Sequence, residues 1–144
     1  MATHDPLKLL AEDADDLAVI SAAVQDAVAH VGDIAWDAHA RRVTIALNRF
    51  RWEAPGAFMS ERVRAGLQFG SVLAVRARRL RREPRDAVVE LLAVSFEPVD
   101  PPGGVVRLAF AGGGDLLLEV ECVDAALADI SAPWPTPRTP THRG

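Results

Sequence analysis

Residues 43–53 restrict the fold more than any other stretch, because apolar and polar side chains alternate along most of their length. Val43, Ile45 and Leu47 fall on one side of an extended chain, since successive side chains of a strand point to opposite faces. β-Branched and aromatic residues fit such a pleated, half-buried surface. The pattern predicts the central strand of an antiparallel sheet, with these three aliphatic residues facing the core.

The second half of this strand places its large apolar residues on the other side. Phe50 and Trp52 have the opposite parity to Val43, and one face buries both groups only if the strand bulges or bends. We place that irregularity at Asn48–Arg49, which leaves Arg49 and Arg51 on the outer side. The sequence thus predicts that the rings of this segment turn inward and that its guanidinium groups face water.

The totals predict one globular domain followed by a tail. Of the 144 residues, 49% are hydrophobic and 25% charged, which is ordinary globular composition. We expect a single domain over residues 1–131. Residues 132–144 contain four prolines, which remove backbone donors and fix φ, so a disordered Pro-rich tail is expected there. There is no apolar run of the roughly 20 residues that span a bilayer, the first residues lack the basic and apolar regions of a signal peptide, and there is one cysteine. We therefore expect a cytoplasmic protein with no membrane partner.

Residues 13–31 have the pattern of an amphipathic helix. Asp13 is a good N-cap, and Asp15 and Asp16 would lie in the first turn, where the helix dipole favours negative charge. Gly32 is a plausible stop. One apolar stripe at spacings of three and four comprises Leu17, Ile20, Val24, Val28 and Val31. The stripe predicts that the helix packs on one face of the sheet.

The remaining segments complete an α+β fold. We predict strands in residues 7–11, 64–80, 87–97, 106–110 and 116–122, and a short helix in residues 124–130. The result is an antiparallel sheet of about six or seven strands, strongly twisted or partly closed, with the N-terminal helix packed on it.

Residues 106–122 predict a hairpin whose turn contains a run of glycines. If Phe110 faces Leu116, the register places Arg107 opposite Glu119 on the same face of the sheet.

Charge is segregated along the chain. Residues 1–40 hold one Lys and eight acids, residues 41–85 hold twelve Arg and three acids, and residues 86–144 hold three Arg and nine acids. In the basic block, the outward parity of two strands predicts one basic sheet face, formed by Arg49, Arg51, Arg76 and Arg78. Such a face suits an acidic protein or a small anion. The negative net charge favours the plain alternative, a solvated face paired with acids of the same chain.

Three functions remain open at this point. The favoured one is a non-enzymatic binding or adaptor protein that uses the basic face. The second is an enzyme or small-molecule-binding domain with a pocket between helix and sheet, lined by Trp36, Asn48, Trp52 and Arg49. The third is binding of RNA or another nucleic acid by the arginine block, which the net charge of −4 disfavours. No catalytic motif, metal site or cofactor site is predicted.

Residues 17–53, 72–76 and 110–122, which include the run Leu47–Glu53 and the glycines before Leu118–Cys122, resemble a small bacterial family catalogued only as a domain of unknown function. The resemblance covers residues 7–131. It implies a single cytoplasmic domain whose gene often lies near that for histidinol dehydrogenase, and it implies no catalytic residue.

Overall fold

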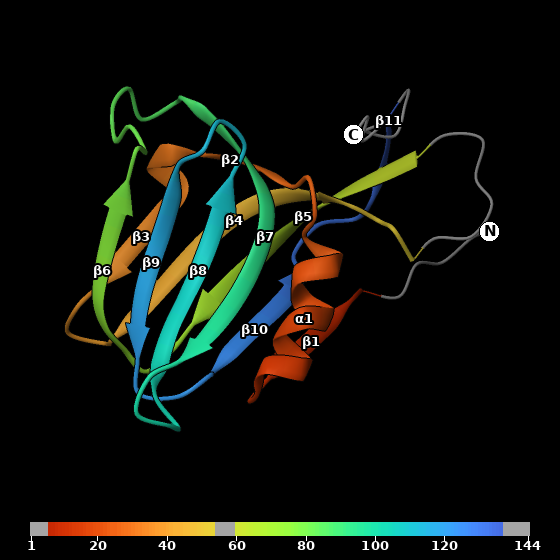
Figure 1. The fold of residues 1–144 in the computed structure, drawn as a ribbon. Coiled ribbons are helices and arrows are strands. Elements are labelled where there is room, and N and C mark those ends of the chain that lie inside the picture. The colour runs from red at the N-terminus through yellow and green to blue at the C-terminus, as the bar shows by residue number, and fades with distance from the viewer. Residues whose placement is uncertain (1–5, 54–59, 137–144) are drawn as a thin grey trace.

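The computed structural model describes residues 6–53 and 60–136, which form eleven strands, one α-helix and one 3₁₀ turn (Figure 1). The helix α1 spans Ala14–Ala23 and the turn η1 spans Val31–Asp33. The strands are β1 (Lys8–Ala11), β2 (Val28–His30), β3 (Ile34–Asp37), β4 (Arg42–Phe50), β5 (Ser60–Phe69), β6 (Val72–Arg78), β7 (Val88–Pro98), β8 (Gly104–Phe110), β9 (Asp115–Val120), β10 (Ala125–Asp129) and β11 (Trp134–Thr136).

These strands form one sheet that folds over into two layers. The order is β1-β10-β5-β4-β2-β7-β8-β9-β6, with β3 also on β4 and β11 on β5. Figure 1 shows the layer of β7, β8, β9 and β6 crossing in front of the layer of β4, β5 and β10. Strand β2 joins the layers, because Val28 pairs with Asn48 of β4 and with Glu90 of β7. The sheet therefore ends at β1 on one side and at β6 on the other.

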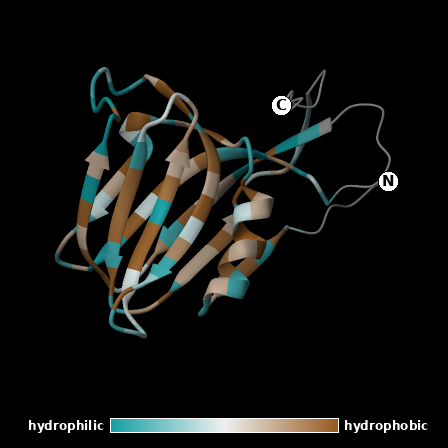
Figure 2. Cartoon of the chain, viewed as in Figure 1, coloured by the Kyte–Doolittle hydropathy of each residue, from teal (hydrophilic) through white to brown (hydrophobic). Residues whose placement is uncertain are grey.

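The core lies between the two layers. Val43, Ile45 and Leu47 of β4 are buried there, as the alternation predicted, and they share one cluster with Leu108 of β8 and Leu118 of β9. Figure 2 shows hydrophobic and hydrophilic residues alternating along several strands of the front layer. This alternation is expected where one face of an antiparallel sheet packs on a core and the other meets solvent.

The predicted α+β class with about six or seven strands is wrong. Within the described residues the protein is mostly antiparallel sheet with a single ten-residue helix. Several added strands are only three to five residues long, and their pairing partners determine their conformation. Residues 125–129, predicted to be helical, form β10, because they pair on one side with β1 and on the other with β5.

The N-terminal helix begins as predicted and ends earlier. Asp13 caps it by accepting a hydrogen bond from the Asp16 N–H at 2.8 Å. Leu17 and Ile20 are buried where α1 packs against β7 and β1. The helix stops after Ala23, and the chain turns through Asp26, which has a positive φ of 65°. The second half of the predicted helix is instead β2 and η1.

The β8–β9 hairpin has a register two residues away from the predicted one. Ala109 pairs with Asp115 and Arg107 pairs with Leu117. The Phe110 N–H donates to the Gly114 carbonyl at 2.9 Å, so only three residues form the turn. Two consecutive glycines of the turn have φ near +90°, which L residues rarely adopt and which permits this tighter connection. Asp115 therefore joins the strand.

The chain also departs from the expected irregular tail. Trp134–Thr136 form β11, which pairs with residues 60–62 of β5. Proline is compatible with a short edge strand of this kind. The rest of the predicted tail, residues 137–144, lies outside the described residues.

Candidate functional site

The outer face of the β7–β8–β9–β6 layer brings together residues from three separate parts of the sequence. Arg107 of β8 stands beside Leu117 of β9, and Leu117 stands beside Arg76 of β6. In the next row, Val105 of β8 stands beside Glu119 of β9. Residues paired across strands point to the same face, so apolar and charged side chains alternate over this surface.

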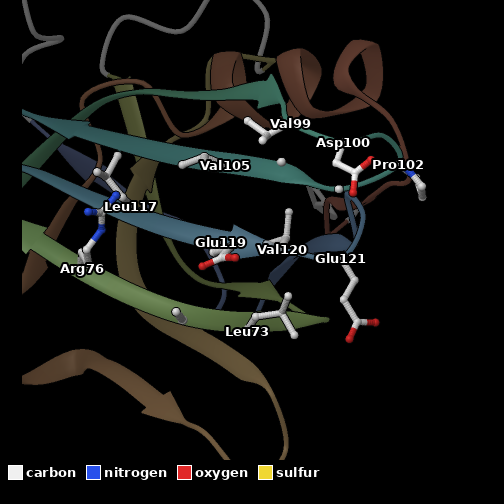
Figure 3. A pocket seen from close by; sticks show the side chains of 13 residues that line it. Leu73, Arg76, Val99, Asp100, Pro102, Val105, Leu117, Glu119, Val120 and Glu121 are labelled. Atoms are coloured by element: carbon white, nitrogen blue, oxygen red, sulfur yellow. The ribbon is translucent and has the colours of Figure 1, made fainter.

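An open groove of about 770 Å³ crosses this face under the loop that joins β7 to β8. Its apolar lining includes Leu73, Val99, Val105 and Leu117, and Leu73 is 45% exposed. Figure 3 shows Arg76 near one end of the groove. The carboxylates of Glu119, Glu121 and Asp100 complete its charged lining. The groove thus combines an apolar floor with opposite charges along its length.

Two further arginines, next to the end of the groove that Arg76 lines, are held in place by one buried aspartate. Asp115 is 2% exposed and accepts hydrogen bonds from Arg78 Nε at 2.9 Å and Nη2 at 2.6 Å, and from Arg107 Nε at 2.8 Å. The hydrogen bonds from Arg78 and then Arg107 hold the pKa of Asp115 well below its ordinary value. Asp115 therefore fixes the orientation of both guanidinium groups, while other Nη donors remain available to a ligand.

Arg76 differs from these two arginines because no hydrogen bond or ion pair joins its side chain to any other described residue. It is exposed and lines the groove. Arg76, Arg78 and Arg107, which we call the arginine cluster, therefore present one unpaired and two oriented guanidinium groups on one face. This arrangement can bind carboxylate or phosphate oxygens by charge-assisted hydrogen bonds.

Comparison with known proteins places the chain in a family. A family model described as "Protein of unknown function (DUF2948)" matches residues 7–142. The chain belongs to this family. The match confirms the resemblance drawn from the sequence, and it spans the groove and the arginine cluster of this DUF2948 member. Comparisons with curated proteins and with solved structures found no match.

Arg49 of this DUF2948 member points into the core, so the outward orientation predicted for it is wrong. Strands β4 and β5 pair without a break from Val43 to Phe50, so the expected bulge is absent and Arg49 keeps the inward parity of Leu47. Arg49 is fully buried, and its guanidinium donates to Asp129, to Glu53 and to the Phe50 carbonyl. These contacts use all five of its N–H donors.

The electrostatics of Arg49 follow from these contacts. Burial opposes its charge, but the hydrogen bonds to Glu53 and Asp129 outweigh burial and raise the pKa of Arg49. The hydrogen bonds that Glu53 accepts from Arg49 lower the pKa of Glu53 below its ordinary value. Arg49 is therefore a paired structural cation, and it has no donor left for a ligand.

The predicted four-arginine face does not form as one surface. Arg51 is joined to Glu61 at 2.5 Å, and β4 is not a neighbour of β6 in the sheet. Arg76 and Arg78 do lie on one outer face, but the arginine that shares this face with them is Arg107 on β8.

The residues of the predicted pocket are also apart. Trp36 pairs with Val43 near the start of β4, whereas Trp52 follows its end and donates from Nε1 to the Gln25 carbonyl at 3.2 Å. Both indoles are more than one third exposed. Asn48 accepts a hydrogen bond from Arg64 at 3.2 Å and lines a cavity of about 80 Å³, which neither tryptophan lines.

Sequence reasoning missed that Arg107, Asp115 and Leu117 belong to the same surface as Arg76. Each of them lay in a predicted strand or turn, but the placement of β9 beside β6 could not be inferred. An acid directly after a glycine run and a lone Arg in an apolar strand were the available signals.

In the part of the chain that the structure describes, no group of three or more His, Cys, Asp or Glu residues is placed to hold a metal ion. No helix among these residues has the length and apolar character needed to cross a bilayer.

We expect the contribution of Asp115 to stability to depend on pH. Because its pKa is lowered in the folded protein, its contribution is present above the ordinary aspartate pKa of about 3.9 and is lost as pH falls towards the lowered value. Asp115→Asn should therefore be less stable than the unchanged protein at pH 7, and the gap should narrow steadily below about pH 4. Urea unfolding of both proteins from pH 7 to pH 2.5 measures this gap. A constant gap over that range would contradict the pairing.

Proposed function

We propose that this DUF2948 member is a non-catalytic binding protein that holds an acidic segment of a partner protein in the groove on the β6–β9–β8 face. The supporting observation is the unpaired Arg76 at the edge of an apolar floor, beside two guanidinium groups already oriented by Asp115. Donors fixed before binding lose less conformational entropy when a ligand arrives.

The charge distribution favours a polypeptide over a nucleic acid. The arginine cluster lies at one end of the face, but Glu119, Glu121 and Asp100 line the rest of the groove. A nucleic acid carries negative charge at every phosphate, so these carboxylates would repel it. A peptide can place acids over the arginine cluster and apolar or basic residues further along.

The apolar floor and the arginines have different roles in this proposal. Leu73, Val105 and Leu117 offer apolar surface whose burial provides affinity. The arginines attract acidic segments and disfavour basic ones, because electrostatic complementarity acts mainly on specificity and association rate. We therefore expect binding to weaken as salt is added.

The test is a selection of displayed random twelve-residue peptides on the immobilised protein, followed by affinity measurements on synthetic peptides by fluorescence anisotropy. We expect the selected peptides to combine Asp or Glu with aliphatic residues. Arg76→Glu replaces an attraction with a repulsion, so it should weaken these peptides about tenfold, which corresponds to about 1.4 kcal/mol.

Arg42→Glu is the matched control. Arg42 is exposed and lies at the start of β4 in the other layer, and its side chain has no hydrogen-bonded or ion-paired partner among the described residues. The Arg42→Glu substitution changes the net charge as much as Arg76→Glu, and we expect it to weaken peptide binding less than twofold. The proposal is refuted if the selected peptides are not enriched in Asp or Glu, or if Arg76→Glu and Arg42→Glu weaken peptide binding equally.

A further inference from the structure

Strand β6 ends the sheet, and its outer edge is open. It pairs with β9 on one side, and within residues 6–53 and 60–136 no strand pairs with it on the other. Among the described residues, one other backbone hydrogen bond involves β6, in which the Val72 N–H donates to the Arg41 carbonyl at 2.9 Å. The outer backbone N–H and C=O groups of an edge strand are ready to pair with another chain.

The open edge is also the border of the groove, because Leu73, Ala74 and Arg76 of β6 line it. Building on the proposed function, we propose that the partner segment binds as an added strand along β6, with alternate side chains over the groove face. Main-chain hydrogen bonds then provide affinity, and the alternate side chains provide specificity, as in other cases of strand addition.

The alternation of β6 specifies which side chains the partner should carry. Ala74, Arg76 and Arg78 point to the groove face, and a residue directly across an added strand lies about 5 Å from each of them on the same face. Acids at two alternate positions would thus face the two arginines. A bulky apolar residue at the next alternate position would lie over the small Ala74 and the floor beside it.

The same residues disfavour a second copy of this chain as the occupant. Two β6 strands paired with matching parity would bring Arg76 and Arg78 of both chains onto one face, where like charges repel. Strand β6 also bulges between Val72 and Ala74, and bulges and charges are common protections of edge strands against self-pairing. An acidic strand meets no such repulsion.

The probe is a nine-residue peptide with blocked ends, in which Asp occupies positions three and five, Leu occupies position seven, and Thr or Val fills the rest. Both this sequence and its reverse are synthesised, so that parallel and antiparallel pairing are covered. We expect one of the two to bind the full-length protein, with at least a tenfold loss in Arg76→Glu. Moving the two Asp to adjacent positions should weaken binding at least fivefold, because one carboxylate then points to the opposite face.

Backbone methylation separates strand addition from simple charge attraction. Two versions of the peptide carry N-methyl groups, one at three even positions and the other at three odd positions. Only alternate N–H groups of an added strand face β6, so one version should bind at least tenfold more weakly and the other less than threefold. The outward N–H groups of β6 should also become protected from hydrogen exchange.

The outcomes distinguish the two proposals. If both methylated versions bind as well as the parent and still depend on Arg76, strand addition is refuted and the groove proposal stands. If peptides bind without dependence on Arg76, the groove proposal fails as well. Absence of binding by both parent peptides would refute strand addition. A dimer of the unchanged protein that the peptide dissociates would refute the acidic partner, because a second copy would then occupy the edge.

Discussion

Arg49→Met is expected to lower the free energy of unfolding by about 3–5 kcal/mol, the usual cost of leaving one member of a buried ion pair without its partner. Arg49 is fully buried and Asp129 has 1% of its side chain exposed. Without the guanidinium, the Asp129 carboxylate keeps only the Leu7 N–H, at 2.9 Å, among its partners in the described residues. Glu53 can turn to water, because 40% of its side chain is already exposed.

Two comparisons identify the cause of this loss. Arg41→Met removes an ion pair with Glu121 whose side chains are about half exposed, and we expect a change of less than about 1 kcal/mol. Adding Asp129→Leu to Arg49→Met removes the stranded charge, so the double variant should regain a large part of the lost stability. Urea unfolding measures all four proteins. Arg49→Met within 1 kcal/mol of the unchanged protein, or a double variant no more stable than Arg49→Met, would contradict this account.

Arg49 also shows how far alternation can be trusted in this sequence. The parity of Val43, Ile45 and Leu47 was read correctly, and continuing it by one step would have placed Arg49 inside. Arginine is rarely buried without partners, and one partner, Asp129, lies 80 residues further along the chain. Local sequence carries no signal for such a pair, so the expected bulge was the simpler interpretation.

Pairing partners explain the other differences in the fold. Ala125–Asp129 have helix-forming composition, but they fill the gap between β1 and β5, where backbone hydrogen bonds require an extended chain. The β8–β9 register differs from the predicted one by two residues, because two consecutive glycines allow a shorter turn. In both cases the tertiary contacts overrode a local preference.

The candidate site was only partly predictable for the same reason. The outward direction of Arg76 and Arg78 followed from β6 alone. Their proximity to Arg107 required the order β8-β9-β6, which the sequence does not specify. The groove is also lined by the loop between β7 and β8, which leads into Gly104, where the backbone of β7 packs closely.

Gly104→Ala is expected to destabilise the protein by about 2–3 kcal/mol, because the added methyl group has no room. Gly104 begins β8 and pairs with Pro98 on one side and Val120 on the other. A Cβ atom there would overlap the Glu97 carbonyl oxygen and lie 2.7 Å from the Phe96 ring. The carbonyl belongs to the backbone of β7, so relief requires the two strands to separate.

Gly66→Ala is the matched control, since Gly66 also lies within a strand but a Cβ there would meet no atom within 4 Å. Alanine restricts the unfolded chain more than glycine does, so this change should leave stability unchanged or raise it by up to about 1 kcal/mol. Urea unfolding measures the change in stability for both substitutions. Opposite signs of the two changes would support close packing at Gly104. Equal effects would mean that β7 does not pack closely on Gly104, where β8 begins beside the groove.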